Sequence, residues 1–424
     1  MPRRRLILVA ALLALGLLYT LSSHGASSPP LQIIPDDCPS RPDLDNILVV
    51  LKTGVTESRA KVPIHLSTTL RCIPNHVLFS DYVEQLSPTH FTHDVLASLS
   101  PALLDHNPEL DLYRRVRADG PAALTSADLN PDVNTPIGKP NNPGWKLDKW
   151  KFLPMLDEAL RVKPDASWYI FLEADTYLVW DNFLEWLRRF DPSRPWYLGN
   201  QMQIVDAVFA HGGSGFALSR PALVQAVNHR KRSSDGWEFA VAEHWAGDCM
   251  LGILLENVGV DLTWSWPMLQ IAPPEEMDYF SVGYAKRPWC YPAVSFHHLD
   301  ERGIRQLDDL ERELGPGPRK TPLLYRDVFL KLVRPELRDV RTDWDNLVEG
   351  DPVRVSSFAA CRGVCTREAK CLQYAYNATE GACRTSTVLA LGHARPGVSA
   401  GWMTERIDAM AESLGECREI SWID

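Results

Sequence analysis

The chain has 424 residues, of which 45% are hydrophobic and 23% charged, so it is long enough to bury a sizeable core in more than one domain. Its formal net charge of −10 gives no basic excess, which argues against a nucleic-acid-binding protein.

The first residues predict a targeting segment. Three arginines at positions 3–5 precede Leu6–Leu21, sixteen residues without a charge. A basic flank before a short apolar run is typical of a secretory signal or an uncleaved signal anchor, although a full span takes about 20 residues. We predict a cytoplasmic tail at 1–5, a membrane-spanning anchor at 6–22 and a stem at 23–43, with the rest of the chain in a lumen. Cleavage near Ala26 would instead release a secreted protein.

Two short apolar runs, at 46–52 and 76–80, are typical of buried strands, and a helical pattern begins at Glu57 between them. This alternation predicts the start of a doubly wound, mostly parallel sheet. The sequence has neither a G-x-G-x-x-G motif nor a Walker loop, so no dinucleotide or ATP phosphate cradle is indicated. Residues 98–145 are rich in proline and predict a long substrate-facing loop, whereas 147–162 predict a single helix.

Residues Trp168–Leu172 predict a central buried strand, and two carboxylates, Glu173 and Asp175, follow it directly. Open α/β sheets bind ligands at the carboxyl ends of their strands. Mn²⁺ and Mg²⁺ prefer carboxylate oxygens and leave positions for a substrate diphosphate. The pattern therefore suits a nucleotide-sugar enzyme, and the alternative is a pair of solvated acids at a strand end.

Three further stretches carry candidate functional residues, each with a structural alternative. Residues 211–216 hold three glycines that permit close backbone approach to a ligand, or form a simple turn. Asp248 stands at the start of an apolar helix, where the helix dipole alone would favour a carboxylate. His297 follows an apolar pair, where a hydrogen-bonded core histidine is also expected.

The C-terminal part has the composition of an oxidised module. Residues 303–350 are charged and predict helices and a linker; a short helix over 357–371 and a strand over 372–376 follow. Five of the nine cysteines fall in the last 64 residues without the spacing of a zinc site, which favours disulfides. Asn377 begins a glycosylation sequon, which suits a lumenal surface loop.

Taken together, these pieces resemble the fringe-like β1,3-glycosyltransferases, most closely the branch of the core 1 β1,3-galactosyltransferases and its fungal members. The resemblance covers about Ile47 to Leu307 and rests on motifs in a fixed order: the Trp150-Lys151 helix, WYIFLEADTYLVWDNF, WYLGN, GGSGFALS, GDCMLG and AVSFHHLD. The cysteine cluster resembles a PAN/Apple-like module. The implied fold is α/β: a GT-A-type, Rossmann-like, mostly parallel sheet with flanking helices at 44–315, closing helices and a linker at 316–350, and a small disulfide-rich α+β module at 351–424.

The resemblance also implies a role for each matched residue. Asp175 would be the main ligand of Mn²⁺ (or Mg²⁺), with His297 and Glu173 completing the site and the neighbouring His298 as an alternative. Asp248 would be the general base and would contact the acceptor. Donor and acceptor would also contact Trp150, Lys151, Gly212, Gly213, Ser214 and Gly215, although the Trp-Lys pair recurs at Trp145-Lys146.

The family usually has Asp at the first two positions of its acidic triplet, where this chain has Glu173 and Ala174. We therefore expect weaker or altered metal use rather than none.

The expected function is inverting transfer of a sugar, galactose in a β1,3 linkage, from a UDP-sugar to a glycan or glycoprotein in the Golgi or ER lumen. The alternatives are a catalytically decayed, lectin-like secretory protein and a glycoside hydrolase, which would need an acid pair flanking the sugar and no metal.

The PAN-like resemblance implies the disulfides Cys365–Cys371 and Cys361–Cys383, and a carbohydrate or protein ligand for the module. Cys417 would then lack a local partner. We also expect the pairs Cys249–Cys290 and Cys38–Cys72, which neither the resemblance nor the spacing of the cysteines implies.

Overall fold

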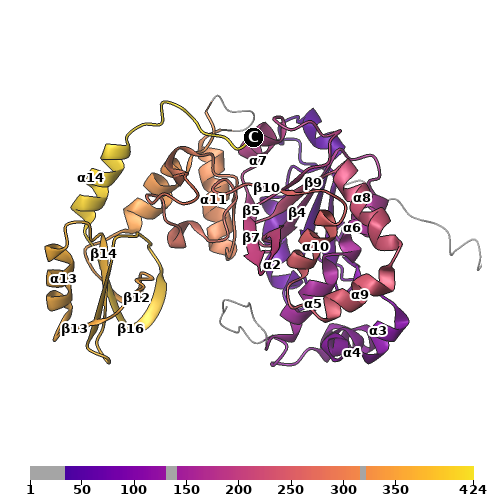
Figure 1. The fold of residues 1–424 in the computed structure, drawn as a ribbon, viewed down its shortest axis with the longest axis horizontal. Coiled ribbons are helices and arrows are strands. Elements are labelled where there is room, and N and C mark those ends of the chain that lie inside the picture. The colour runs from indigo at the N-terminus through magenta and orange to yellow at the C-terminus, as the bar shows by residue number, and fades with distance from the viewer. Residues whose placement is uncertain (1–33, 130–140, 316–320) are drawn as a thin grey trace, which may run out of the picture. The chain divides into compact units, whose positions relative to one another are not determined.

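A computed structural model describes residues 34–129, 141–315 and 321–424 (Figure 1). The predicted tail, the anchor and the first part of the stem lie outside these residues. In the described part of the chain, no helix is both long enough and apolar enough to cross a membrane.

The largest sheet has seven strands and is mostly parallel, as expected. Four of its six neighbouring strand pairs are parallel, and only β9 runs antiparallel to its two neighbours, β4 and β6. In spatial order the strands are β10 (Leu262–Trp264), β6 (Tyr197–Gly199), β9 (Phe216–Ser219), β4 (Trp168–Glu173), β1 (Ile47–Lys52), β2 (His76–Ser80) and β3 (Thr92–Asp94).

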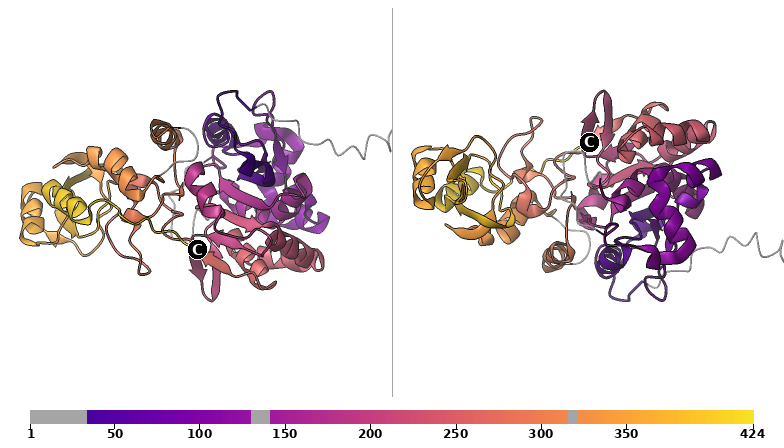
Figure 2. Two further views of the ribbon diagram at one scale, coloured as in Figure 1. Left: turned by 90° about the horizontal axis from the view of Figure 1, so that it is seen from above. Right: turned by 90° about the horizontal axis from the view of Figure 1, so that it is seen from below.

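Both faces of this sheet are buried, which explains why its central strands are continuously apolar. In β1, Leu48 and Val50 enter one hydrophobic cluster, whereas Val49 and Leu51 enter another on the opposite face. Helices flank the sheet (Figures 1 and 2). They are α2 (Ser58–Ser67), α3 (Pro101–His106), α4 (Asp111–Asp119), α5 (Pro143–Lys151), α6 (Pro154–Val162), α7 (Trp180–Leu187), α8 (Arg220–Lys231), α9 (Ser234–Ala242) and α10 (Gly247–Glu256). Two later helices, α11 (Glu301–Glu313) and α12 (Tyr325–Val328), enter a separate hydrophobic cluster that also holds Trp402 and Ile407.

Two predictions about the segment before β4 were wrong because proline begins helices here rather than excluding them. Pro101 and Pro143 stand in the first turns of α3 and α5, where a missing N–H costs nothing. The described residues between 98 and 129 therefore hold two α-helices instead of one long loop. Pro154 likewise begins α6 and divides the single helix predicted over 147–162.

The C-terminal residues form a second, antiparallel sheet. Its strands, in spatial order, are β12 (Arg341–Asp345), β16 (His393–Trp402), β14 (Gln373–Asn377), β15 (Ala382–Ser386) and β13 (Val353–Arg354), with helices α13 (Phe358–Arg367) and α14 (Thr404–Leu414). Strand β12 lies in the segment predicted as helices and linker. Its partner β16 follows it by about 50 residues in the chain, and such a distant pairing leaves no local pattern.

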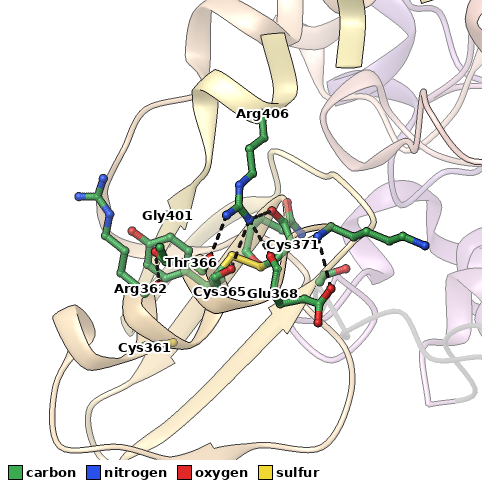
Figure 3. The surroundings of a disulfide bond; sticks show 12 residues. Cys361, Arg362, Cys365, Thr366, Glu368, Cys371, Gly401 and Arg406 are labelled. Carbon is green, nitrogen blue, oxygen red and sulfur yellow. Dashed lines mark hydrogen bonds between the residues drawn. A yellow bond between two sulfur atoms is a disulfide. The ribbon is translucent and has the colours of Figure 1, made fainter. Parts of the chain in front are cut away.

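Arg406 of α14 ties this sheet's helix α13 to the turn that follows it (Figure 3). Its guanidinium donates to the carbonyl oxygens of Cys365, Glu368 and Cys371 at 3.3, 2.7 and 2.9 Å, and to that of Thr366 at 3.0 Å. A cation at the carboxyl end of a helix also interacts favourably with the helix dipole. The arginine thus holds the segment that the Cys365–Cys371 disulfide closes.

The structure has four disulfides, and three are pairs that the sequence analysis expected: Cys365–Cys371, Cys361–Cys383 and Cys38–Cys72. The expected Cys249–Cys290 pair was wrong. Cys290 bonds to Cys417, 127 residues further along the chain. Cys249 is the free cysteine and is buried on α10; burial, followed by the nearby Asp248 carboxylate, raises the pKa of its thiol to about 12.

We predict that thiol labelling of the non-reduced protein modifies Cys249 alone, and only after denaturation, because its sulfur is buried in the native fold. Peptide mapping should recover Cys290 linked to Cys417, and Cys249→Ser should abolish the label. A denatured, non-reduced protein labelled at Cys417 would contradict the observed pairing.

Candidate active site at the carboxyl edge of the central sheet

The acidic strand end faces a lysine from the neighbouring strand. Strands β1 and β4 run parallel with Lys52 opposite Glu173, so both side chains lie at the same edge of the sheet. Lys52 Nζ lies 3.1 Å from Glu173 Oε1 and 3.3 Å from Asp148 Oδ2. Burial alone would lower the pKa of Lys52, but these two carboxylates outweigh it and raise the pKa. Glu173 is therefore held by a buried ammonium group.

His297 reaches Asp175 through a short antiparallel pair. Strand β11 (Ser295–Phe296) pairs with β5 (Tyr177–Leu178), which follows the acidic segment. The Leu299 N–H also donates to the Asp175 carbonyl at 3.0 Å. As a result, His297 Nε2 lies 3.1 Å from Asp175 Oδ1, although 122 residues separate the two in the chain.

The glycine-rich segment joins these two elements. The Thr176 hydroxyl donates to the Gly213 carbonyl, and the Ser295 hydroxyl donates to the Ser214 carbonyl, both at 2.6 Å. Gly213 packs so closely on the His297 ring that an added Cβ would lie 2.1 Å from Cε1 of that ring. Gly215 has a φ of +77°, which favours glycine. The glycines thus allow the chain to pass directly against the site.

Asp248 completes the site from helix α10. Its Oδ2 accepts the Gly212 N–H at 3.0 Å and its Oδ1 accepts the Cys249 N–H at 2.9 Å. Burial, opposed by the Gly212 hydrogen bond and helped by the nearby Glu173 charge, raises the pKa of Asp248 to about 6. The helix cap is Ala246, so Asp248 is not simply an N-capping residue. A carboxyl with this pKa is suited to general-base chemistry near neutral pH.

A cavity of about 650 Å³ brings these groups together. Its lining includes six carboxylates and three lysines, an excess of negative charge. The charged lining residues are Lys52, Glu57, Lys61, Asp128, Asp148, Lys149, Glu173, Asp175 and Asp248; His211, Gly213, His297 and His298 lie among them, and Trp145, Met202, Ile204, Phe209 and Trp245 supply apolar wall.

Three of the lining residues could hold a metal ion. Asp175, His297 and His298 each offer a ligand atom, and these atoms lie within 4.8 Å of one another. A carboxylate with two imidazoles suits a transition metal such as Mn²⁺ better than Mg²⁺. The structure therefore brings His298 into the group, while the nearest oxygen of Glu173 lies 4.0 Å from His297 Nε2. Glu173 lies outside this group of three and pairs with Lys52, and its role as a metal ligand stays a prediction.

Asp175 is paired at both oxygens. Its Oδ2 accepts from Lys61 Nζ at 3.0 Å, opposite the contact with His297. Burial alone would raise the pKa of Asp175, but His297 and Lys61 outweigh it and hold the pKa well below its ordinary value. The carboxylate is thus ionised, which is the form in which an aspartate binds a metal ion.

Trp150 and Lys151 lie behind the cavity wall rather than in it. Lys151 is fully buried and pairs with Asp81 and Asp148, each at 2.8 Å, and Trp150 is a core residue. The Trp-Lys pair recurs five residues earlier, and in a helix that offset turns the side chain by about 140°. Accordingly it is Trp145 that lines the cavity, stacked on Trp245 with ring centroids 6.4 Å apart.

Ala174, the departure from the family's acidic triplet, does not line the cavity. Its side chain is 2% exposed, and its carbonyl accepts from His65 Nε2 at 2.9 Å. Burial, only partly offset by that hydrogen bond, lowers the pKa of His65 to about 4, so the imidazole is neutral. In this chain the middle position of the triplet therefore contributes a backbone hydrogen bond to His65 and no side chain to the cavity.

The sequence analysis missed Lys52, Lys61 and Asp148. Lys52 had a usable signal, because a lysine ending one parallel strand faces the acid ending its neighbour. Lys61 and Asp148 stand in helices whose packing against the strand ends cannot be deduced from local pattern.

Comparison with known proteins shows that part of the chain is similar to one family. Residues 155–301, which include Asp175, Asp248 and His297, match the model described as Fringe-like. These residues are fringe-like. A human protein named beta-1,3-glucosyltransferase is 28% identical over 108 residues, or 22% of this chain and 22% of that protein. A Xenopus laevis protein named glycoprotein-N-acetylgalactosamine 3-beta-galactosyltransferase 1 is 26% identical over 168 residues, or 34% of this chain and 45% of that protein.

The match thus covers less than half the length of either relative. Both relatives are glycosyltransferases by name, in agreement with the family inferred from the sequence motifs. The C-terminal cysteine module lies outside the fringe-like residues, and its PAN/Apple-like character stays a prediction.

We predict that Gly213→Ala disrupts the site, because the new methyl group would overlap the His297 ring and overpacking costs about 1–3 kcal/mol. The variant should unfold at a lower temperature and bind Mn²⁺ more weakly than wild type in calorimetry.

Gly363→Ala, in helix α13, is a matched control. Its new methyl group would meet only the flexible Arg367 side chain at 3.5 Å, so the Mn²⁺ affinity should stay near wild type. The unfolding temperature should not fall, because alanine is more favourable than glycine inside a helix. A Gly213→Ala protein with unchanged Mn²⁺ affinity would contradict the assigned geometry.

Proposed function

We propose that the chain is an inverting glycosyltransferase with a GT-A-type fold, which moves a sugar from a UDP-sugar to a glycan or glycoprotein. Galactose and a β1,3 linkage are our proposed donor sugar and product. The observation that carries this proposal is the convergence of Asp248 and the group Asp175, His297 and His298 on one cavity within the fringe-like residues.

Asp248 is the proposed general base. Inverting transfer requires one group to take the proton of the acceptor hydroxyl as that oxygen attacks the anomeric carbon. Asp248 lines the cavity, and two backbone N–H groups fix the orientation of its carboxylate. Since its pKa is about 6, it is largely ionised at neutral pH yet basic enough to accept the proton. The transfer needs no covalent enzyme intermediate.

The other charged side chains are suited to holding the diphosphate end of the donor. Six carboxylates in the lining would repel a diphosphate, so the site needs added positive charge. A divalent cation bound by Asp175, His297 and His298 would supply that charge and stabilise the departing UDP. Lys52, which also pairs with Asp148, holds Glu173 beside this group.

The cellular setting is also a proposal. Four disulfides favour an oxidising compartment, which agrees with placement in the Golgi or ER lumen behind an N-terminal anchor.

We propose further that the C-terminal module binds a carbohydrate or protein and that Asn377 carries a glycan. Asn377 lies at the end of β14 next to an exposed turn, where the modification would not meet the core.

The decisive test is release of UDP from a panel of UDP-sugars, with and without Mn²⁺. We expect one donor to be turned over only with metal. Asp248→Asn should lower kcat by about 10²–10⁴-fold, the usual contribution of a general base, while UDP and Mn²⁺ affinities stay within a few-fold of wild type. Asp235→Asn, on the exposed start of α9, is the matched control and should be fully active.

Full activity of Asp248→Asn would exclude it as the base. A wild-type protein that binds neither UDP nor Mn²⁺ and releases no UDP would favour the lectin-like alternative.

We predict that kcat/KM for the donor falls as pH decreases through about 6. Only the ionised carboxylate of Asp248 can accept a proton, so activity should be constant above about pH 7 and fall tenfold per pH unit below about pH 5. UDP and Mn²⁺ binding measured over the same range separates loss of the base from loss of ligands. A flat profile between pH 5 and 7 would contradict the assignment.

A further inference from the structure

Lys61 occupies one oxygen of the carboxylate that is proposed to hold the metal. Its ammonium lies 3.0 Å from Asp175 Oδ2 and 2.8 Å from Glu57 Oε2, one turn earlier on α2. The other Asp175 oxygen, Oδ1, faces His297 Nε2. Two side-chain groups therefore already bracket this carboxylate.

Lys61 differs from the other two lysines that line the cavity. Lys52 and Lys149 are 5% and 7% exposed and pair with Glu173 and Glu109, which lie outside the candidate metal group. The Lys61 side chain is 37% exposed, and its partner Asp175 belongs to that group. Among the described lining residues, Lys61 is thus the lysine that is exposed enough to move and whose partner, Asp175, could bind a metal ion.

A divalent cation and the Lys61 ammonium cannot share Asp175 without cost. Two like charges within a few ångströms repel strongly in a partly buried site. A cation bound at Asp175 would therefore weaken the contact with Lys61. The displaced ammonium would stay in the cavity, because α2 holds its backbone at the wall and its four-carbon stem is flexible.

We propose that Lys61 is an exchangeable counter-ion, which holds Asp175 while no metal is bound and turns to a diphosphate oxygen of the nucleotide once metal occupies Asp175. The inference rests on the proposed function and deepens it by assigning a positioning residue. It predicts opposite effects on two ligands: Lys61 opposes binding of the metal alone and favours binding of the nucleoside diphosphate.

The test is isothermal titration calorimetry on the full chain, first with Mn²⁺ alone and then with UDP at saturating Mn²⁺. In Lys61→Met we expect Mn²⁺ to bind about three- to tenfold tighter and UDP about three- to tenfold weaker, the range expected for loss of one partly exposed charge. Lys61→Arg keeps the charge and should keep both affinities within about twofold of wild type.

Lys231→Met is the matched control. Lys231 is an exposed helical lysine that also pairs with an aspartate, Asp157 at 3.5 Å, but it lies on α8 and does not line the cavity. Both affinities should be unchanged in this variant.

Each outcome bears on the inference. Mn²⁺ affinity that is unchanged or weaker in Lys61→Met, or UDP affinity that is unchanged, would overturn it, as would Lys61→Arg behaving like Lys61→Met. In those cases Mn²⁺ and UDP binding by the wild type would still support the proposed function. Absence of Mn²⁺ binding in the wild-type protein would overturn the metal-dependent function and this inference together.

Discussion

The site depends on the close approach of the Gly212–Gly215 backbone to two other segments. Gly213 leaves no room for a side chain against His297, and the hydroxyls of Thr176 and Ser295 bind neighbouring carbonyls of this segment. Thr176 follows the acidic strand end, and Ser295 precedes His297. Three segments, distant in the chain, are therefore joined by backbone contacts that any bulkier residue at Gly213 would force apart. The N–H of Gly212 extends the same segment to Asp248.

The second organising feature is a nearly complete pairing of charges around the cavity. Lys52 lies between Asp148 and Glu173, Lys151 between Asp81 and Asp148, and Asp175 between His297 and Lys61. Buried ions persist only when such partners offset the loss of hydration. Asp248 is the exception, because its carboxylate contacts two backbone N–H groups and, among the described residues, no cation. That difference explains why its pKa is raised while that of Asp175 is lowered, and it separates the proposed base from the proposed metal ligand.

These contacts explain how the chain accommodates Glu173 and Ala174 where the family usually has two aspartates. At Ala174 the backbone carbonyl binds His65, and the buried side chain does not line the cavity. At Glu173 the longer side chain reaches Lys52. The third position, Asp175, keeps its place opposite His297. His297 and His298 are therefore the residues grouped with Asp175, whereas a metal role for Glu173 stays a prediction.

Sequence alone determined the features that show as a local residue pattern or as motifs in a fixed order along the chain. The apolar runs of β1, β2 and β4 predicted a parallel sheet, because a strand buried on both faces must be apolar throughout. The order of six motifs pointed to the family and to Asp175, Asp248 and His297, and the density of cysteines predicted disulfides. Tertiary structure decided what depends on contacts between distant segments. How helices and strands pack determines four features: the partner of Cys290, the pairing of β12 with β16, the place of Trp145 rather than Trp150 in the cavity wall, and the contact of Lys61 with Asp175. No local pattern records that packing, because the energy of each contact comes from residues far apart in the chain.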